Sequence, residues 1–265
     1  SAYRYPRQYG PTPPSFARAM RGPGGTRYVS GTASVVGHET RHPGELRAQL
    51  DAWEAFLNRP SLEQRITSRY LYEHWFLAEL HFEDRPAGPF FRVVRSRTAP
   101  GQPVSEIATV RPYDDPGPEL WYRLVPIESS IVHKTHIVYS IGPRRLARLE
   151  KLFFAADWKA TRLPGYTADE ASNPFAAFDQ IPARSRYQFL LDDAQYFVMT
   201  FIRGPVCRGQ VAVDVVDDHF FVAFLDPDRD LSVADPTFLE RTKSLLRLPA
   251  ENRGRLLPGE VFLAY

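Results

Sequence analysis

Apolar residues recur every three or four positions in five stretches of the chain, which is the spacing of one buried helix face. The predicted helices cover residues 43–58, 61–80, 143–154, 183–203 and 236–248. Pro43 suits the first position of a helix, and Ser61 suits an N-cap because Gln64 follows three residues later. Gly204 and Pro205 are expected to end the fourth helix, since glycine adopts a left-handed cap and proline cannot continue a helix.

Short apolar runs rich in β-branched and aromatic residues predict strands. They cover residues 28–36, 90–97, 106–110, 120–125, 211–215, 220–225 and 261–265, and residues 127–140 also favour extended structure. The helices are segregated from hairpins that look antiparallel. The pattern therefore predicts an α+β fold, with a mixed or antiparallel sheet and several packed helices.

The predicted strand at 90–97 carries three arginines among its apolar residues. Arg95 and Arg97 share one face of this strand, and Arg92 lies on the other. Two interpretations stay open. The segment is either an edge strand with solvated arginines or an anion site.

Composition narrows the classes of function. The chain has 265 residues, of which 43% are hydrophobic and 24% charged, as is typical of a globular protein. Its formal net charge of +2 is too small to indicate nucleic-acid binding. One cysteine excludes an intrachain disulfide and a cysteine-rich zinc site. No apolar run approaches the roughly 18 residues of a membrane span. No secretory signal opens the chain, so we expect a fragment or a processed form.

The turn after the fourth predicted helix concentrates candidate chemistry. Arg203, Cys207 and Arg208 lie there beside two glycines, so guanidinium groups and backbone amides are able to face one anion. The alternative is an ordinary helix-to-strand connection with solvated arginines. We expect an apolar cavity beside Cys207, bordered by this turn.

Histidine spacing gives little support for a metal site. His133 and His136 lie in a segment that favours extended structure, where residues three apart face opposite sides and no third ligand is near. They are candidates for a proton donor, an orienting group or a structural role. His74 and His81 fall on one face of the predicted helix but about 10 Å apart, so we interpret them as capping or core groups. We therefore predict no metal site.

The predicted helix at 143–154 has one apolar and one basic face. The basic residues are Arg144, Arg145, Arg148 and Lys151. They suit either contact with an anionic membrane surface or a solvated face, and the helix is too short to bind a membrane alone.

Several longer segments resemble the fatty acid cis/trans isomerase family, bacterial enzymes that remodel membrane lipids. They occur in the same order over about residues 53–260 and include RYLYEHWFLAELHF (69–82), RLVPIESSIVHKTHIVY (123–139) and FVMTFIRGPVCRGQ (197–210). The resemblance implies conversion of cis to trans double bonds in phospholipid fatty acids, a covalently attached c-type haem and a periplasmic location. The chain has no Cys-x-x-Cys-His motif, so we expect no haem cofactor in it and a portion that binds a fatty acyl chain or phospholipid. The candidate site residues are Arg95, His133, His136, Arg203, Cys207 and Arg208.

The first 50 residues resemble a second family, the chorismatases, which release pyruvate from chorismate. The similarity lies in SAYRYPRQYGPTPPSFARAM and VSGTASVVGHETRHPGELRAQLDAW. It implies a βα unit from a trimeric RidA-like fold, with Glu39 as a catalytic acid and Tyr3 and Arg4 near the substrate carboxylate. We therefore predict a chorismatase-like segment at 1–50 and an isomerase-like domain at 51–265. Three functions stay open: the isomerase, a chorismatase-like hydrolase, and a non-catalytic acyl-binding chain. The oligomeric state is left open.

Overall fold

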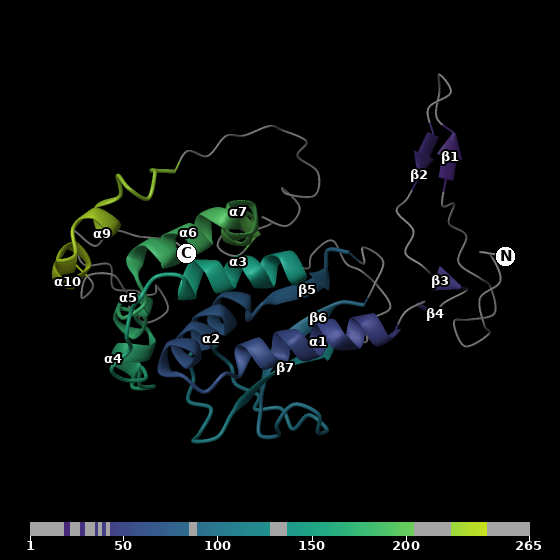
Figure 1. Cartoon of the computed structure of the whole chain (residues 1–265), viewed down its shortest axis with the longest axis horizontal. Helices are drawn as coiled ribbons and strands as arrows, with labels where there is room; N and C mark the ends of the chain where they lie inside the picture. Colours follow the sequence, from purple (N-terminus) through teal and green to yellow (C-terminus); the bar gives the residue numbers. More distant parts are fainter. Residues whose placement is uncertain are drawn as a thin grey trace.

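The computed structural model describes residues 19–21, 27–29, 35–36, 39–40, 43–84, 89–127, 137–203 and 224–242. At the N-terminal end, strands β1 (Ala19–Arg21) and β2 (Arg27–Val29) pair antiparallel, as do β3 (Val35–Val36) and β4 (Glu39–Thr40). Figure 1 shows these four short strands apart from the sheet and the helices that cover it. Of the strand predicted at 28–36, residues 28–29 belong to β2 and residues 35–36 to β3, and the positions between them lie outside the described residues.

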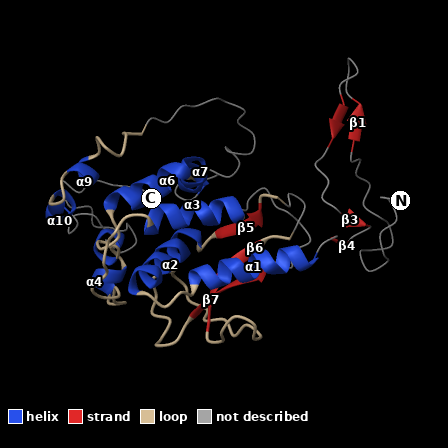
Figure 2. Cartoon of the chain, in the orientation of Figure 1, coloured by secondary structure: helices blue, strands red, loops and turns tan. Residues whose placement is uncertain are grey.

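The main sheet has the order β7-β6-β5-β8. Its strands are β5 (Ala78–Phe82), β6 (Phe91–Ser96), β7 (Trp121–Pro126) and β8 (Ile137–Ile141). β6 pairs antiparallel with both β5 and β7, whereas β5 and β8 are parallel. Helices and this mixed sheet confirm the α+β class, as Figure 2 shows. The RidA-like fragment stays a prediction.

Five of the described helices have ten residues or more. They are α1 (Pro43–Leu57), α2 (Leu62–Trp75), α3 (Pro143–Phe154), α6 (Ala183–Asp192) and α7 (Ala194–Arg203). The short helices are α4 (Ala168–Ala171), α5 (Pro174–Ala177), α9 (Leu231–Ala234) and α10 (Phe238–Thr242). The N-cap predicted at Ser61 is confirmed, because its Oγ accepts the backbone N–H of Gln64 at 3.2 Å. The predicted bounds of α3 are also confirmed.

Three predictions about these elements are wrong, and one of the two alternatives for residues 90–97 is excluded. The helix predicted at 61–80 ends at Trp75, so His81 lies on strand β5 and does not share a helix face with His74. The helix predicted at 183–203 is interrupted at Asp193, whose carboxylate accepts hydrogen bonds from Tyr139 and Arg145. β6 is an interior strand and not an edge. Residues 106–110 form only a single bridge to the sheet, at Glu106.

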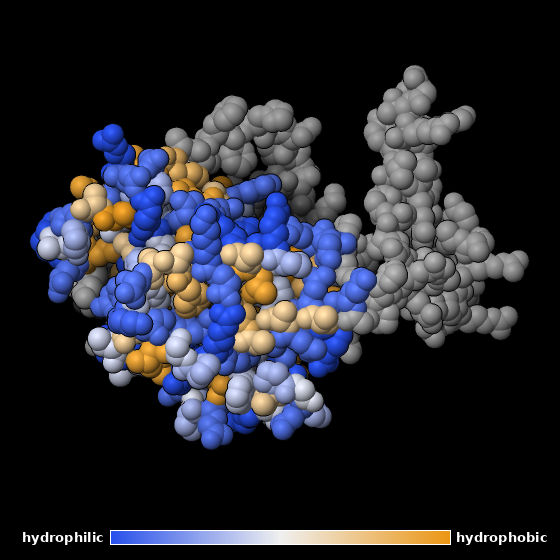
Figure 3. Space-filling model, in the orientation of Figure 1, coloured by the Kyte–Doolittle hydropathy of each residue, from blue (hydrophilic) through white to orange (hydrophobic). Residues whose placement is uncertain are grey.

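One aromatic cluster forms the centre of the core. Trp53 of α1, Trp75 of α2 and Tyr139 of β8 pack in sequence, with ring centroids 6.0 and 5.3 Å apart. All three side chains are almost completely buried. The surface in Figure 3 is mainly hydrophilic, with apolar residues visible in separate small areas.

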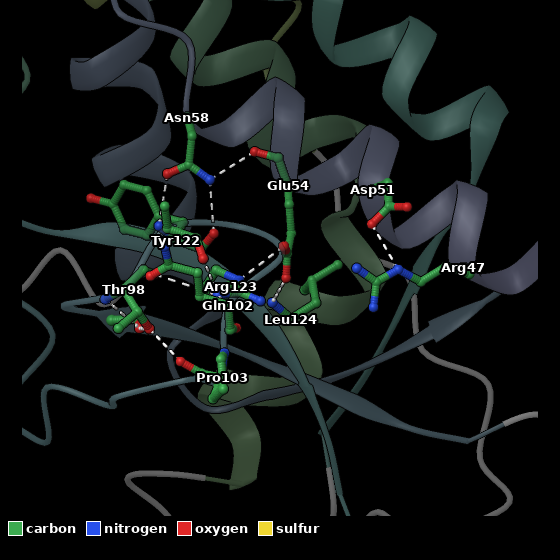
Figure 4. A network of polar contacts seen from close by, with 12 residues as sticks. Arg47, Asp51, Glu54, Asn58, Thr98, Gln102, Pro103, Tyr122, Arg123 and Leu124 are labelled. Atoms are coloured by element: carbon green, nitrogen blue, oxygen red, sulfur yellow. Dashed lines mark hydrogen bonds and ion pairs between the residues drawn. The ribbon is translucent and has the colours of Figure 1, made fainter.

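A buried polar network attaches α1 to the sheet (Figure 4). Glu54 accepts from the Nε of Arg123 at 2.9 Å and from the backbone N–H of Leu124 at 2.9 Å. Asn58 bonds to both the N–H and the carbonyl of Tyr122, at 2.8 Å each. Because burying unpaired polar groups is costly, these reciprocal bonds fix the position of α1 on β7.

The predicted boundary between residues 50 and 51 falls inside helix α1, which continues through Asp51 without interruption. Leu46 and Leu50, on the N-terminal side of that position, pack against the same core as Trp53. The part of α1 that lies inside the chorismatase-like segment therefore packs with the main body, at least from Leu46 onwards. The division into two domains stays a prediction.

Candidate functional site

An apolar cavity of about 630 Å³ lies between the end of α2 and helices α6 and α7. Most of its wall is aliphatic or aromatic, with residues from the loop at 112–113 completing it. The lining residues used below are Glu73, His74, Tyr187, Leu190, Ala194 and Val198. Its size is within the range of about 300–1,000 Å³ that is usual for small-ligand sites.

His74 presents a neutral imidazole to this cavity. Its Nδ1 lies 2.7 Å from the carbonyl of Tyr70, and because a carbonyl only accepts, Nδ1 carries the proton. Nε2 therefore holds a lone pair, and no donor to it is found among the residues that the structure describes. Burial lowers the pKa of His74 to about 4, so the ring is uncharged at neutral pH.

Glu73 is the acidic residue in the cavity wall. Its Oε1 accepts from the Nε of Arg69, one helical turn earlier, at 2.7 Å, and this ion pair is largely buried. Burial raises the pKa of Glu73, while the Arg69 guanidinium opposes that rise. The carboxylate is thus directed towards an arginine, and the cavity otherwise remains apolar.

Arg95 is not the solvated residue of an edge strand. Its side chain is 1% exposed, with Nη1 donating to the carbonyl of Asp114 at 2.8 Å and Nη2 to Thr109 at 2.7 Å. Its guanidinium carbon lies 5.0 Å from the ring centroid of Tyr72. Arg92, on the opposite face, is exposed and pairs with Glu106 at 2.6 Å.

The basic residues of α3 are used mostly within the protein. Arg145 pairs with Asp193, and Arg148 pairs with Asp192 at 2.6 Å, both at the end of α6. Arg144 pairs with Glu83 at 2.7 Å. These pairs leave little uncompensated charge on α3, which weakens its interpretation as a membrane-binding face.

Most of the other predicted site residues lie outside the described part of the chain. They are Tyr3, Arg4, His133, His136, Cys207 and Arg208. The structure gives the backbone but not the side chain of Glu39, in β4, and Arg203, at the end of α7. Their roles stay predictions. The apolar cavity is lined by α7, the helix that precedes Cys207 in the sequence.

The sequence interpretation missed Arg69, Glu73 and the cavity role of His74. A signal was present, because Arg69 follows the buried Ile66 by three residues and directly precedes the buried Tyr70, so it lies on the apolar face of the helix. A charged residue on an apolar helix face, with an acid four residues later, indicates a buried ion pair.

The described residues do not fit a covalent c-type haem. Two thioether bonds need two cysteines, and the chain contains one. Within the described ranges, no group of three or more histidine, cysteine or acidic residues is placed to hold a metal ion. No described helix is long and apolar enough to cross a bilayer.

Comparison with known proteins gives two matches of different extent. A family model described as "Fatty acid cis/trans isomerase (CTI)" matches residues 28–265. The 3-hydroxybenzoate synthase of Streptomyces hygroscopicus is 54% identical over 55 residues, which is 18% of this chain and 16% of that protein. A chorismatase of Streptomyces rapamycinicus is 50% identical over 56 residues, 19% of this chain and 17% of that protein. The chain thus spans only a small part of these curated relatives. No solved structure matches.

Proposed function

The chain belongs to the fatty acid cis/trans isomerase family, and we propose that its apolar cavity holds the unsaturated acyl chain on which that family acts. The supporting observation is a cavity of about 630 Å³ with an almost wholly apolar wall. Burial of apolar surface drives such binding, at roughly 25 cal/mol per Å².

The polar groups of the wall are arranged so that they do not oppose an acyl chain. His74 is neutral, and the charge of Glu73 is compensated by Arg69. An uncompensated charge in the wall would be costly beside a hydrocarbon. This cavity binds and orients the acyl chain. None of the described residues is given a role in weakening the double bond.

The finer features follow from the family and not from the cavity. We propose that the natural substrate is the acyl chain of a membrane phospholipid, that the protein acts in the periplasm, and that conversion needs a haem portion outside this chain. The chain alone is then expected to bind cis-octadec-9-enoate without releasing the trans isomer.

Calorimetric titration with cis-octadec-9-enoate tests the binding step. Val198→Phe places a larger side chain in the cavity wall and is expected to weaken binding at least tenfold. Val138→Phe is the matched control, because Val138 is 40% exposed on β8 and does not line the cavity. Equal affinity in the two variants, with both folded, would exclude this cavity as the acyl site. Gas chromatography of the recovered fatty acid tests for conversion.

A second candidate function rests on the short chorismatase match. It is a hydrolase that acts on chorismate with Glu39 as the catalytic acid. Chorismate consumption by the purified chain, lost in Glu39→Gln, would support it. No consumption by the unmodified chain would leave the acyl-binding proposal as the better one.

A further inference from the structure

A second cavity, of about 620 Å³, borders α2 at Arg65 and Arg69 and is more polar. It is bordered by the connection between α1 and α2, by the start of β7 and by the loop at 163–166. Its polar lining includes Asn58, Arg59, Arg65, Arg69, Glu119, Tyr122 and Tyr166. The Arg69–Glu73 ion pair connects the two cavities, because Arg69 lines this one and Glu73 lines the apolar one.

Arg69 has an unused donor. Its side chain is 5% exposed, Nε donates to Glu73, and Nη1 donates to the carbonyls of Pro164 and Gly165 at 2.9 and 3.0 Å. The guanidinium carbon lies 4.0 Å from the ring centroid of Tyr166. The buried Nη2 finds no acceptor in the described structure. A buried guanidinium N–H without a partner is unfavourable, so an acceptor from a ligand would stabilise the site.

The charge around Arg69 is also incompletely balanced. Arg95 is also almost fully buried, and its Nε has no acceptor in the described structure while its other nitrogens donate to neutral oxygens. Glu73 pairs with Arg69, and the charge of Arg95 acts on the same carboxylate without an ion pair between them in the described part of the chain. Two guanidinium groups and one carboxylate leave a buried net charge of about +1.

Two tyrosine hydroxyls add uncharged donors. Tyr122 is 5% exposed, and Tyr166 packs on Arg69. For the described residues, neither hydroxyl has a hydrogen-bond partner. Burial raises the pKa of both phenols, so both keep their protons at neutral pH. Both tyrosines line the same cavity as Arg69, and the ring of Tyr166 lies against its guanidinium group.

We propose that this polar cavity binds a singly charged oxyanion, a carboxylate or a phosphodiester, held by Arg69, Tyr122 and Tyr166. One negative charge balances the excess at Arg69 and Arg95, and two or three oxygens satisfy the unused donors. Arg65 lies exposed at the rim with no ion pair to a described residue, and adds positive charge there. Glu119 is also exposed at the rim. Solvent screens the repulsion between its carboxylate and the bound anion, so Glu119 reduces the affinity only slightly.

The test uses two small probes, acetate and dimethyl phosphate, each titrated against the full chain at constant ionic strength, with chloride as the reference. We expect saturable binding of at least one oxyanion and none of chloride. The double variant Tyr122→Phe/Tyr166→Phe keeps both rings and removes both hydroxyls, and is expected to weaken binding at least tenfold. Tyr187→Phe is the matched control, since its hydroxyl donates to the carbonyl of Leu225 beside the apolar cavity.

The outcomes separate the possible ligands. A preference for acetate indicates the carboxylate of a free fatty acid, and a preference for dimethyl phosphate indicates a phospholipid head group. Binding equal to that of chloride, or undiminished in Tyr166→Phe as well as in the double variant, would overturn the proposal. The titration contains no lipid, so its result is independent of whether the apolar cavity binds an acyl chain.

Discussion

Replacing Glu54 tests whether α1 forms one body with the sheet. Glu54 and Arg123 form an ion pair whose side chains are 6% and 7% exposed. Glu54→Gln keeps the shape and one acceptor oxygen but removes the charge that balances Arg123. Asp51→Asn, one turn earlier on the same helix, breaks the pair between Arg47 and Asp51, whose side chains are 62% and 55% exposed (Figure 4).

The two substitutions differ in cost because of burial. Removing one partner of a buried ion pair costs about 3–5 kcal/mol, since the other charge stays buried without compensation. Arg123 keeps its bonds to the carbonyls of Ala99 and Gln102, at 2.7 and 3.1 Å, so we expect the lower end, about 3 kcal/mol. An exposed pair at this helical spacing contributes about 0.3–0.5 kcal/mol.

Urea unfolding, followed by tryptophan fluorescence, measures both costs. Trp53 and Trp75 are at most 2% exposed and report directly on the contact between α1 and α2. The expected result is a large loss for Glu54→Gln and almost none for Asp51→Asn, in one cooperative transition. A cost below about 1 kcal/mol for Glu54→Gln would refute the reasoning, because it would mean that α1 is not fixed on the sheet. The network does not line the apolar cavity, so acyl affinity of the folded variant should be unchanged.

Three further substitutions concern the two cavities. The pKa of His74 is about 4 in the folded protein and 6.5 in the unfolded chain, so the free energy of unfolding should decrease as the pH drops from 6.5 to 4. In urea unfolding, this decrease should be smaller in His74→Gln, by up to about 3 kcal/mol. Asp193→Asn weakens contacts to Tyr139 and Arg145 at the break between α6 and α7, and should cost about 2–3 kcal/mol. Calorimetry should also show weaker acyl binding in that variant. Glu73→Gln removes the carboxylate opposite Arg69, and should tighten oxyanion binding roughly tenfold in the same titration.

Local features of the fold were predictable, and long-range pairing was not. The start of α2 follows from Ser61, and α3 follows from its strongly amphipathic pattern. The end of α2 was missed because Leu77 and Leu80 continue the apolar spacing, although Leu80 belongs to a strand paired with Tyr139. That parallel partner lies 59 residues away, and no local pattern specifies it.

The same difference explains the site. The arginines on β6 allowed either solvated positions on an edge strand or an anion site, because the sequence pattern does not show which strands flank β6 or which arginine is buried. Arg95 is buried because Tyr72 of α2 and the loop that carries Thr109 and Asp114 contact its side chain. The spacing of Arg69 and Glu73 is enough to predict that they pair, although this signal was missed, whereas the two cavities beside them are formed by loops and helices up to about 150 residues further along the chain.

One ion pair on α2 therefore serves two surfaces with opposite requirements. An acyl chain needs a wall without free charge, and an anionic head group needs a positive one. The wall of the apolar cavity is free of uncompensated charge only while Arg69 balances the carboxylate of Glu73. Arg69 can bind an anion in the polar cavity only through Nη2, the nitrogen that has no acceptor in the described structure. The residues at 69 and 73 cannot be optimised independently. A change that strengthens anion binding by removing Glu73 also leaves Arg69 without its carboxylate next to the apolar cavity, so the affinities for the two parts of an amphiphile are expected to move in opposite directions.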